Sequence, residues 1–258
     1  MRNVLLTVVC GIAVLSFAYF GNFLRGIYDS NKELLSPIIG ISNSPKPQEN
    51  KKSLEIDGYQ IAWVEVEKLD KISLYPNLVD HKTAKGLYKE KGCKTLVNGG
   101  FYTDDDKHIG LLVSNGDKKS EFKENILFDG VINIGSNSAE IKSTHNGANT
   151  AIQSGPILAL GGKPKKLSIK NDENERRMVV ATTKNGEVIF LSIYKKDSAY
   201  IGPKLADVPK ILEEFSRVTG IIPVSALNLD GGTASAFYTE GVSLGELTKI
   251  GSYFCVKD

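Results

Sequence analysis

The sequence contains little of what common metal and nucleic-acid sites require. It has three cysteines (Cys10, Cys93, Cys255) and three histidines, with neither a CxxC pair nor an HExxH pattern. A zinc site built from these residue types is therefore not predicted. The net charge is +2 and no long run of Lys or Arg occurs, so the sequence has no electrostatic signature of nucleic-acid binding and no such partner is expected.

The remaining composition is that of an ordinary globular protein. The chain has 258 residues, of which 41% are hydrophobic and 24% charged. This length allows one large domain or two small ones.

The first regional feature is an uncharged segment, VLLTVVCGIAVLSFAYF, at residues 4–20, preceded by Arg2. Its length lies at the short end of the ~17–25 residues that span a bilayer, and a basic start before an apolar core also describes an export signal. We expect residues 1–24 to be a membrane anchor, with a cleaved signal peptide as the alternative. Either reading predicts a domain outside the cytoplasm, anchored to the membrane or secreted.

A polar, proline-containing stretch follows and predicts a flexible linker at residues 25–53. The folded domain is then expected at 54–258, and about two hundred residues can bury a core that needs no disulfide. Cys93 and Cys255 are left as either a disulfide or two buried thiols.

Strand patterns dominate this domain. Alternation and β-branched content predict strands at 59–66, 72–76, 94–98, around 126–134 and 151–160, at 224–229 and at 253–256. Asn-Gly pairs at 115–116 and 185–186 predict two hairpins. Helices are expected within 82–91 and at 205–218, where Leu205, Val208, Ile211, Leu212, Phe215 and Val218 share one face and Gly220 ends the helix. The fold class is therefore α+β, a mixed β-sheet with a few packed helices.

Three glycine-bearing loops each follow an apolar strand. They are LVNGGFYTDD (96–105), IQSGPILALGG (152–162) and LNLDGGTAS (227–235), with Asn98, Ser154 and Asp230 at the strand ends. Glycine pairs allow backbone N–H groups to approach an anion, and polar residues on converging loops are a common way to build a site. Arg177, which opens RMVVATTKNG, has the side chain suited to binding a phosphate through paired hydrogen bonds, although a solvated edge charge is an equal alternative.

In this order and spacing, the segments NGGFY, IGLLVSNGDK, QSGPIL, RMVVATTKNG and LNLDGGTAS resemble the phosphodiester glycosidase family. The resemblance covers about residues 55–258. Some positions depart from the family pattern: Ile109 replaces a proline, Met178 a small hydroxyl residue, Ala181 a glycine, and Thr233 and Ala234 replace Gly and Ser. These departures affect a hydroxyl-dependent step more than carboxylate chemistry.

The resemblance implies hydrolysis of the sugar C1–O bond of sugar-1-phosphodiesters in envelope or extracellular glycans. In this reading Asp230 is the nucleophile or the base for water, Arg177 binds the departing phosphate, and Asn98 orients the substrate. Further substrate-binding positions are Gly99, Gly100, Tyr102, Ser154, Gly155, Asn228, Gly231, Gly232, Thr233 and Ser235.

A second carboxylate and a general acid are not assigned. Glu175 lies close to Arg177 in sequence, and the run Asp104–Asp106 beside the first glycine loop leaves a divalent cation open, although no cofactor is expected. Two other functions compete with the glycosidase. One is a non-catalytic envelope protein that binds a phosphosugar polymer on the same scaffold, and the other is a phosphodiesterase that cleaves P–O.

Overall fold

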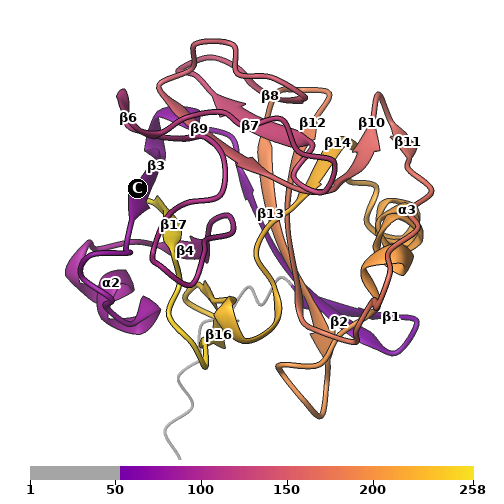
Figure 1. Ribbon diagram of the computed structural model, residues 1–258. Coiled ribbons are helices and arrows are strands. Elements are labelled where there is room, and N and C mark those ends of the chain that lie inside the picture. Colours follow the sequence, from indigo (N-terminus) through magenta and orange to yellow (C-terminus); the bar gives the residue numbers. More distant parts are fainter. Residues whose placement is uncertain (1–52) are drawn as a thin grey trace, which may run out of the picture. The chain divides into compact units, whose positions relative to one another are not determined.

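The computed structural model describes residues 53–258, which form three β-sheets and two α-helices (Figure 1). The expected membrane segment at 1–24 and nearly all of the expected linker at 25–53 lie outside the described residues. Among the described residues, no helix is both long and apolar enough to cross a bilayer.

The largest sheet has seven strands in the order β1-β2-β13-β12-β14-β10-β11. Their bounds are Ser53–Ile56 (β1), Tyr59–Val66 (β2), Val188–Lys195 (β13), Arg177–Thr183 (β12), Pro223–Asn228 (β14), Ile157–Leu160 (β10) and Lys163–Pro164 (β11).

Two five-stranded sheets complete the fold. The first has the order β16-β15-β4-β17-β3, with bounds Ser243–Leu244, Phe237–Tyr238, Thr95–Asn98, Ser252–Val256 and Ile72–Pro76. The second has the order β6-β5-β9-β7-β8, with bounds Asp117–Ser120, Leu112–Ser114, Thr150–Ser154, Gly130–Ile134 and Ala139–Lys142.

The prediction of a sheet-rich α+β domain with few helices is confirmed, although three sheets take the place of one. Among the described strands, the paired neighbours run antiparallel. Both Asn-Gly hairpins are present, β5–β6 and β12–β13. Gly116 and Gly186 adopt positive φ there (91° and 84°), which a residue with a side chain rarely does.

The core lies on both faces of the seven-stranded sheet. Because successive side chains of a strand point to opposite faces, Met178 and Val180 of β12 pack toward the other two sheets, whereas Val179 and Ala181 pack with helix α3 (Val208–Thr219). The sequence of β12 is apolar at consecutive positions for this reason.

Helix α3 follows a short 3-10 turn, Leu205–Asp207, and its C-cap is Gly220 with φ of 76°. The expected buried face is confirmed at Val208, Ile211, Leu212 and Phe215. It was wrong at Val218, which is 53% exposed.

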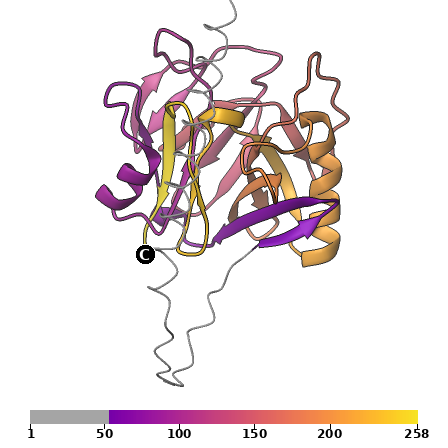
Figure 2. The ribbon, with the colours of Figure 1, turned by 90° about the horizontal axis from the view of Figure 1, so that it is seen from below.

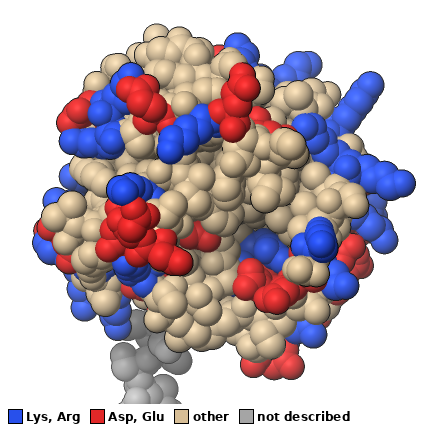
Figure 3. Space-filling model, viewed as in Figure 1, with Lys and Arg blue, Asp and Glu red and all other residues tan. Residues whose placement is uncertain are grey.

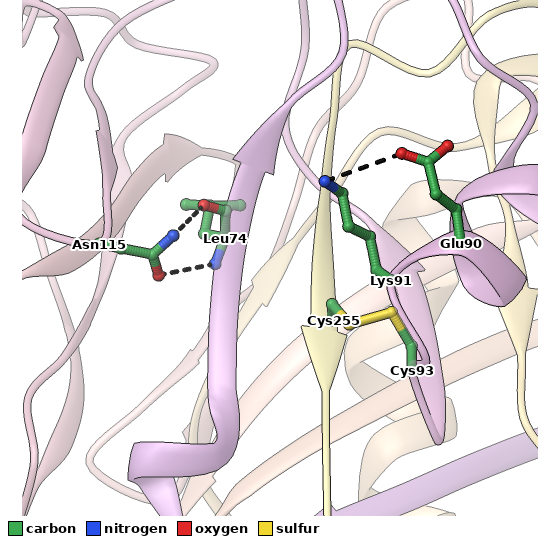
Figure 4. The surroundings of a disulfide bond; sticks show 6 residues. All are labelled: Leu74, Glu90, Lys91, Cys93, Asn115 and Cys255. Carbon is green, nitrogen blue, oxygen red and sulfur yellow. Dashed lines mark hydrogen bonds and ion pairs between the residues drawn. A yellow bond between two sulfur atoms is a disulfide. The ribbon is translucent and has the colours of Figure 1, made fainter.

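The two helices lie on opposite sides of the domain (Figures 1 and 2). Helix α2 (Ala84–Glu90) packs beside β4, and Cys93 follows it. Cys93 forms a disulfide with Cys255 of β17, at a Cα–Cα distance of 5.4 Å (Figure 4). The pairing that the sequence left open is therefore present in the structure.

A second link in the same region joins the β5–β6 hairpin to β3. The side chain of Asn115 donates to the carbonyl oxygen of Leu74 at 3.0 Å and accepts from its N–H at 3.4 Å (Figure 4). The β5–β6 hairpin is thus held against β3.

Candidate active site

Two of the three glycine loops are in direct contact at the ends of β4 and β14. The N–H of Asp230 donates to the carbonyl oxygen of Gly99 at 3.1 Å. The amide nitrogen of Asn98 donates to the carbonyl oxygen of Asp230 at 2.7 Å. Strand ends that are more than a hundred residues apart in sequence therefore meet in one place.

The third loop joins the same place through Asn228. The hydroxyl of Ser154 and the N–H of Gly155 both donate to the carbonyl oxygen of Asn228, at 2.7 and 3.1 Å. In return, the amide of Asn228 donates to the carbonyl oxygen of Gly155 at 2.9 Å. All three loops that the sequence singled out thus converge within two residues of Asp230.

Asn98 connects the loops instead of facing a ligand. Besides its bond to Asp230, its amide nitrogen donates to the carbonyl oxygen of Gly99 at 3.2 Å, and its amide oxygen accepts from the N–H of Ala236 at 2.9 Å. Its side chain is buried. The geometry describes a positioning residue, and direct action of Asn98 on a substrate stays a prediction.

Asp230 carries a half-buried carboxyl group with unusual proton affinity. Burial and, to a smaller extent, the negative charge of Glu175 raise its pKa to about 8, although a hydrogen bond from the backbone of Gly231 acts in the opposite direction. A buried carboxylate is costly unless it is well solvated by donors, so the group keeps its proton. At neutral pH Asp230 is therefore mostly a protonated acid.

Glu175 supplies a second carboxyl group at the same loop. A β-carbon built on Gly232 would lie 2.8 to 3.0 Å from the carboxyl atoms of Glu175, which shows how closely that group covers the loop. Gly232 also has φ of +57°. Glycine is thus needed at position 232 for its backbone conformation and for the space that the carboxyl group of Glu175 occupies.

Arg177 lies behind Glu175 and not at the surface. Its guanidinium donates to the carbonyl oxygen of Pro203 at 3.0 Å and to Asp172 at 3.1 Å. Its Nη1 lies 3.6 Å from a carboxyl oxygen of Glu175. In this arrangement Arg177 fixes Glu175, and a direct bond from Arg177 to phosphate stays a prediction.

Arg176 is the residue that the sequence reasoning missed. It is fully buried, and its guanidinium donates to the hydroxyl of Ser235 at 2.7 Å, to the carbonyl oxygen of Ser235 and to that of Gly245 at 2.7 Å. Its own carbonyl oxygen accepts from the N–H of Gly232 at 2.9 Å. Through these hydrogen bonds, the buried Arg176 fixes both ends of the segment from Gly232 to Ser235.

The pair Arg176-Arg177 contained a signal for this arrangement. Adjacent residues at the start of a strand point to opposite faces, so one of the two arginines had to enter the side of the sheet on which the loops lie. Which of the two does so depends on strand register, which the pair alone does not reveal.

The predicted binding positions differ in their access to a ligand. Ser235 is fully buried, and its hydroxyl donates to the carbonyl oxygen of Gly232 at 2.5 Å. Thr233 is exposed, with its hydroxyl 3.3 Å from that of Thr248. Of these two hydroxyls, the structure makes only that of Thr233 accessible from solvent.

The backbone donors of the glycine pairs are partly occupied. The N–H of Gly99 bonds to the carbonyl oxygen of Ser252 at 2.7 Å, and that of Gly232 bonds to Arg176. The N–H of Gly231 already bonds to the carboxyl group of Asp230, so an anion at this site would rely on Gly100 for a backbone donor.

Aromatic residues of the first loop flank the site. Phe101 packs against Phe128 with ring centroids 4.8 Å apart. The hydroxyl of Tyr102 donates to the carbonyl oxygen of Lys249 at 2.6 Å, and burial raises its pKa, with a further contribution from the charge of Asp230. Tyr102 is thus within electrostatic reach of Asp230, whereas Phe101 belongs to an aromatic contact under the loop.

Two of the three aspartates in the run 104–106 are engaged in ion pairs. Asp105 contacts Lys107 at 2.5 Å, and Asp106 contacts Lys249 and His81, the latter at 3.4 Å. Among the described residues, no group of three or more His, Cys, Asp or Glu side chains is arranged to hold a metal ion.

The face seen in Figure 3 is hollowed near its centre, and both acidic and basic side chains border the hollow.

Comparisons with known proteins identify the family and the fold. The model of the phosphodiester glycosidase family matches residues 91–256. The catalytic domain of zebrafish N-acetylglucosamine-1-phosphodiester alpha-N-acetylglucosaminidase, auto-inhibited by its pro-peptide, is similar in structure with a TM-score of 0.61 and 16% identity, over 80% of this chain and 81% of that one.

Two further solved structures share the fold. A hypothetical protein from Synechocystis has a TM-score of 0.61 and 13% identity over 80% of this chain and 61% of its own. A putative exported protein from Burkholderia pseudomallei has a TM-score of 0.51 and 9% identity over 78% of this chain and 74% of its own. Among curated protein sequences, none matches this one.

Proposed function

Because the chain belongs to the phosphodiester glycosidase family, we propose that it is a hydrolase that cleaves the bond between C1 of a sugar and the ester oxygen of its phosphate. The observation that carries the proposal is the carboxyl group of Asp230, half-buried where three glycine loops meet. Glu175 lies against the same loop. Hydrolysis of a glycosyl bond is commonly carried out by two such carboxyl groups with different environments.

The two carboxyl groups divide the chemistry between them. Asp230, which holds its proton to about pH 8, donates it to the ester oxygen as the C1–O bond breaks and the electron pair leaves with the phosphate. Glu175 takes a proton from the water that attacks C1. The products are a free sugar and a phosphate monoester, and solvent returns the proton to Asp230.

The positively charged and hydroxyl groups have supporting roles. Arg177 orients the carboxylate of Glu175 through its Nη1 group, 3.6 Å away. The exposed hydroxyl of Thr233 and the N–H of Gly100 bind phosphate oxygens. The leaving phosphate gains negative charge as the C1–O bond breaks, so donors that bind this charge add to the effect of proton donation by Asp230.

We assign the protein to an oxidising compartment outside the cytoplasm, with an envelope or extracellular glycan as substrate. The Cys93–Cys255 disulfide supports this location because such bonds persist mainly in exported proteins. The apolar segment at residues 4–20 supports it independently as an anchor or export signal.

The decisive test is hydrolysis of a panel of α- and β-hexose-1-phosphate methyl diesters in water enriched in oxygen-18. Label in the released sugar supports C1–O cleavage, and label in the phosphate would assign the protein to the phosphodiesterases instead. Asp230→Asn and Glu175→Gln should each lower kcat by at least 100-fold, on the scale expected for loss of an acid or base. Glu67→Gln, which changes an exposed carboxylate after β2, is the matched control and should keep full activity.

One observation favours a second function, the binding of a phosphosugar polymer without cleavage. Asn98, Ser154 and Ser235 direct hydrogen bonds to the protein's own backbone and are buried. Saturable polymer binding by a wild-type protein that releases no product from any diester would establish this function and exclude the hydrolase.

A further inference from the structure

A short segment after β16, residues 247–249, is bonded to the loop that follows Asp230. The N–H groups of Leu247 and Thr248 both donate to the carbonyl oxygen of Thr233, at 2.8 and 3.0 Å. A carbonyl oxygen has two lone pairs, so both donors can be satisfied by this one acceptor. The segment 247–249 is therefore fixed against the third glycine loop by its backbone.

The first glycine loop holds the other end of this segment. The hydroxyl of Tyr102 donates to the carbonyl oxygen of Lys249 at 2.6 Å, and the ammonium group of Lys249 lies 5.7 Å from the centre of the Tyr102 ring. The same ammonium group pairs with Asp106. None of these contacts uses the side chain of Thr248, so the position of the segment does not depend on that side chain.

The side chain of Thr248 reaches two hydroxyl groups of the candidate site. Its hydroxyl donates to that of Thr233 at 3.3 Å, and both threonines are exposed. Burial and the charge of Asp230 raise the pKa of Tyr102, whereas a hydrogen bond with the hydroxyl of Thr248 lowers it. Thr248 therefore places a hydroxyl beside Thr233 and Tyr102, in the neighbourhood of Asp230.

This pair of threonine hydroxyls is available to a ligand. Their separation of 3.3 Å is longer than the about 2.7–2.8 Å that is usual between hydroxyls, so the contact is weak. The next residues of the loop offer no substitute, because Ala234 has no hydroxyl and that of Ser235 is buried and bonded to Gly232. Thr248 thus supplies the second accessible hydroxyl beside Thr233.

We propose that Thr248 is a substrate-binding residue, which acts with Thr233 to bind two oxygens of the same phosphate group. The two hydroxyls are close enough to reach two oxygens on one phosphorus atom, and their hydrogens can rotate towards a ligand. Hydrogen bonds to a charged acceptor are stronger than those between neutral groups, so phosphate can replace the long contact between the threonines. The inference rests on the proposed function, because it assigns a residue to the leaving phosphate of that reaction.

Binding is tested first, without hydrolysis, by calorimetric titration of the full chain with a hexose-1-phosphate. Thr248→Val keeps the shape of the side chain but removes the hydroxyl, and it should raise Kd about 10-fold, on the scale of one hydrogen bond to a charged group. Thr248→Ser, which keeps the hydroxyl, should stay within about 2-fold of the wild type. An unchanged Kd in Thr248→Val, or no binding by the wild type, would overturn the assignment.

Thr144→Val is the matched control for the titration. It makes the same change at an exposed threonine whose hydroxyl has no hydrogen-bond partner within residues 53–258. Its Kd for the hexose-1-phosphate should equal that of the wild type. A loss as large as that of Thr248→Val would mean that the substitution acts without a phosphate contact, and would also overturn the assignment.

Kinetics then identify the group that Thr248 binds. For a hexose-1-phosphate methyl diester, Thr248→Val should lower kcat/KM about 10-fold, and Thr248→Ser should restore it. For the hexosyl fluoride of the same sugar, which has no phosphate, both variants should match the wild type. An equal loss on both substrates, or no loss on either, would overturn the phosphate contact.

The two experiments separate this inference from the proposed function. If the wild-type protein hydrolyses neither the diester nor the fluoride, the proposed function fails. The titration still decides whether Thr248 binds phosphate, because it needs no turnover.

Discussion

The carboxyl group of Asp230 lowers the stability of the fold at higher pH, and its proposed catalytic role explains why it is present. Its pKa is raised from 3.8 to about 8 by burial, so the folded protein binds a proton that the unfolded chain releases above about pH 4. The contribution of Asp230 to stability therefore falls as the pH rises from about 4 to about 8, and this contribution is constant above that range. The groups that set this behaviour are Asp230 itself, the charge of Glu175 and the backbone of Gly231.

Asp230→Asn should accordingly stabilise the protein while it removes activity. Because the amide is neutral at every pH, we expect a gain of ~1–2 kcal/mol at pH 8, as is common when a strained functional group is replaced. The gain should shrink towards pH 4. Urea unfolding at several pH values measures it, and a gain that is independent of pH would show that the charge of Asp230 is not its cause.

Gly155 illustrates how tightly the loops are packed. A β-carbon at this position would lie 2.2 Å from the carbonyl oxygen of Leu127 and 2.8 Å from the Cα of Phe128. Both are backbone atoms, which cannot rotate away as a side chain can. We expect Gly155→Ala to cost about 1–3 kcal/mol of unfolding free energy and to displace Asn228, to which Gly155 is bonded.

Gly135→Ala is the matched control for this substitution. Its β-carbon would have only ordinary contact, 3.5 Å from the carbonyl oxygen of Ser138. Thermal unfolding of the two variants compares them directly. Equal losses would mean that the crowding around residue 155 is relieved by movement of the 127–129 segment.

In helix α3, the hydrophobic periodicity of the sequence predicts burial correctly at Phe215 and wrongly at Val218. Phe215 is fully buried and meets Trp63 edge to face, with ring centroids 5.3 Å apart, whereas Val218 is 53% exposed. We expect Phe215→Ala to lower the unfolding free energy by ~3–5 kcal/mol and Val218→Ala to change it by less than about 0.5 kcal/mol. Urea unfolding gives both values, and a large loss at Val218 would place that residue in an interface that the helix face alone does not reveal.

Long, regular elements could be predicted from sequence because their patterns repeat. Strand β2 has the predicted bounds, 59–66, and both Asn-Gly hairpins form where expected. The two-residue strands β11, β15 and β16 were not predicted. Two residues are too few to show a periodic pattern, and these strands form through pairing with other strands: β11 with β10, β15 with β4, and β16 with β15.

The site was predictable in part for the same reason. The three glycine loops and Asp230 are visible as motifs, and they do meet. That Arg176 and not Arg177 supports the loop depends on strand register. The proximity of Glu175 to Gly232 depends on how β12 and β14 pair, a contact between distant parts of the chain that local pattern does not encode.

The disulfide ties together parts of the molecule that are 162 residues apart in sequence. Cross-linking a separation this long removes much of the freedom of the unfolded chain, so replacing both Cys93 and Cys255 by alanine should cost ~2–4 kcal/mol. Urea unfolding with and without a reductant measures this. The reductant should lower the stability of the wild-type protein to that of the double variant and leave the variant unchanged, and an unaffected wild type would mean that the bond carries no stability.

Strand β17 has a further consequence, which concerns time. It lies between β3 and β4, although it is synthesised after every other described strand, and its Ser252 accepts the bond from Gly99. At the usual rate of synthesis, on the order of 10–30 seconds separate the appearance of β4 from that of its partner.

During this interval the nascent chain has made its first glycine loop but not the strand that supports it. Cys93 waits for Cys255 through the same seconds, while Cys10 has already been synthesised. The thiol that is made first is therefore not the native partner. Formation of the native disulfide therefore requires that Cys93 stay unreacted until Cys255 has been synthesised.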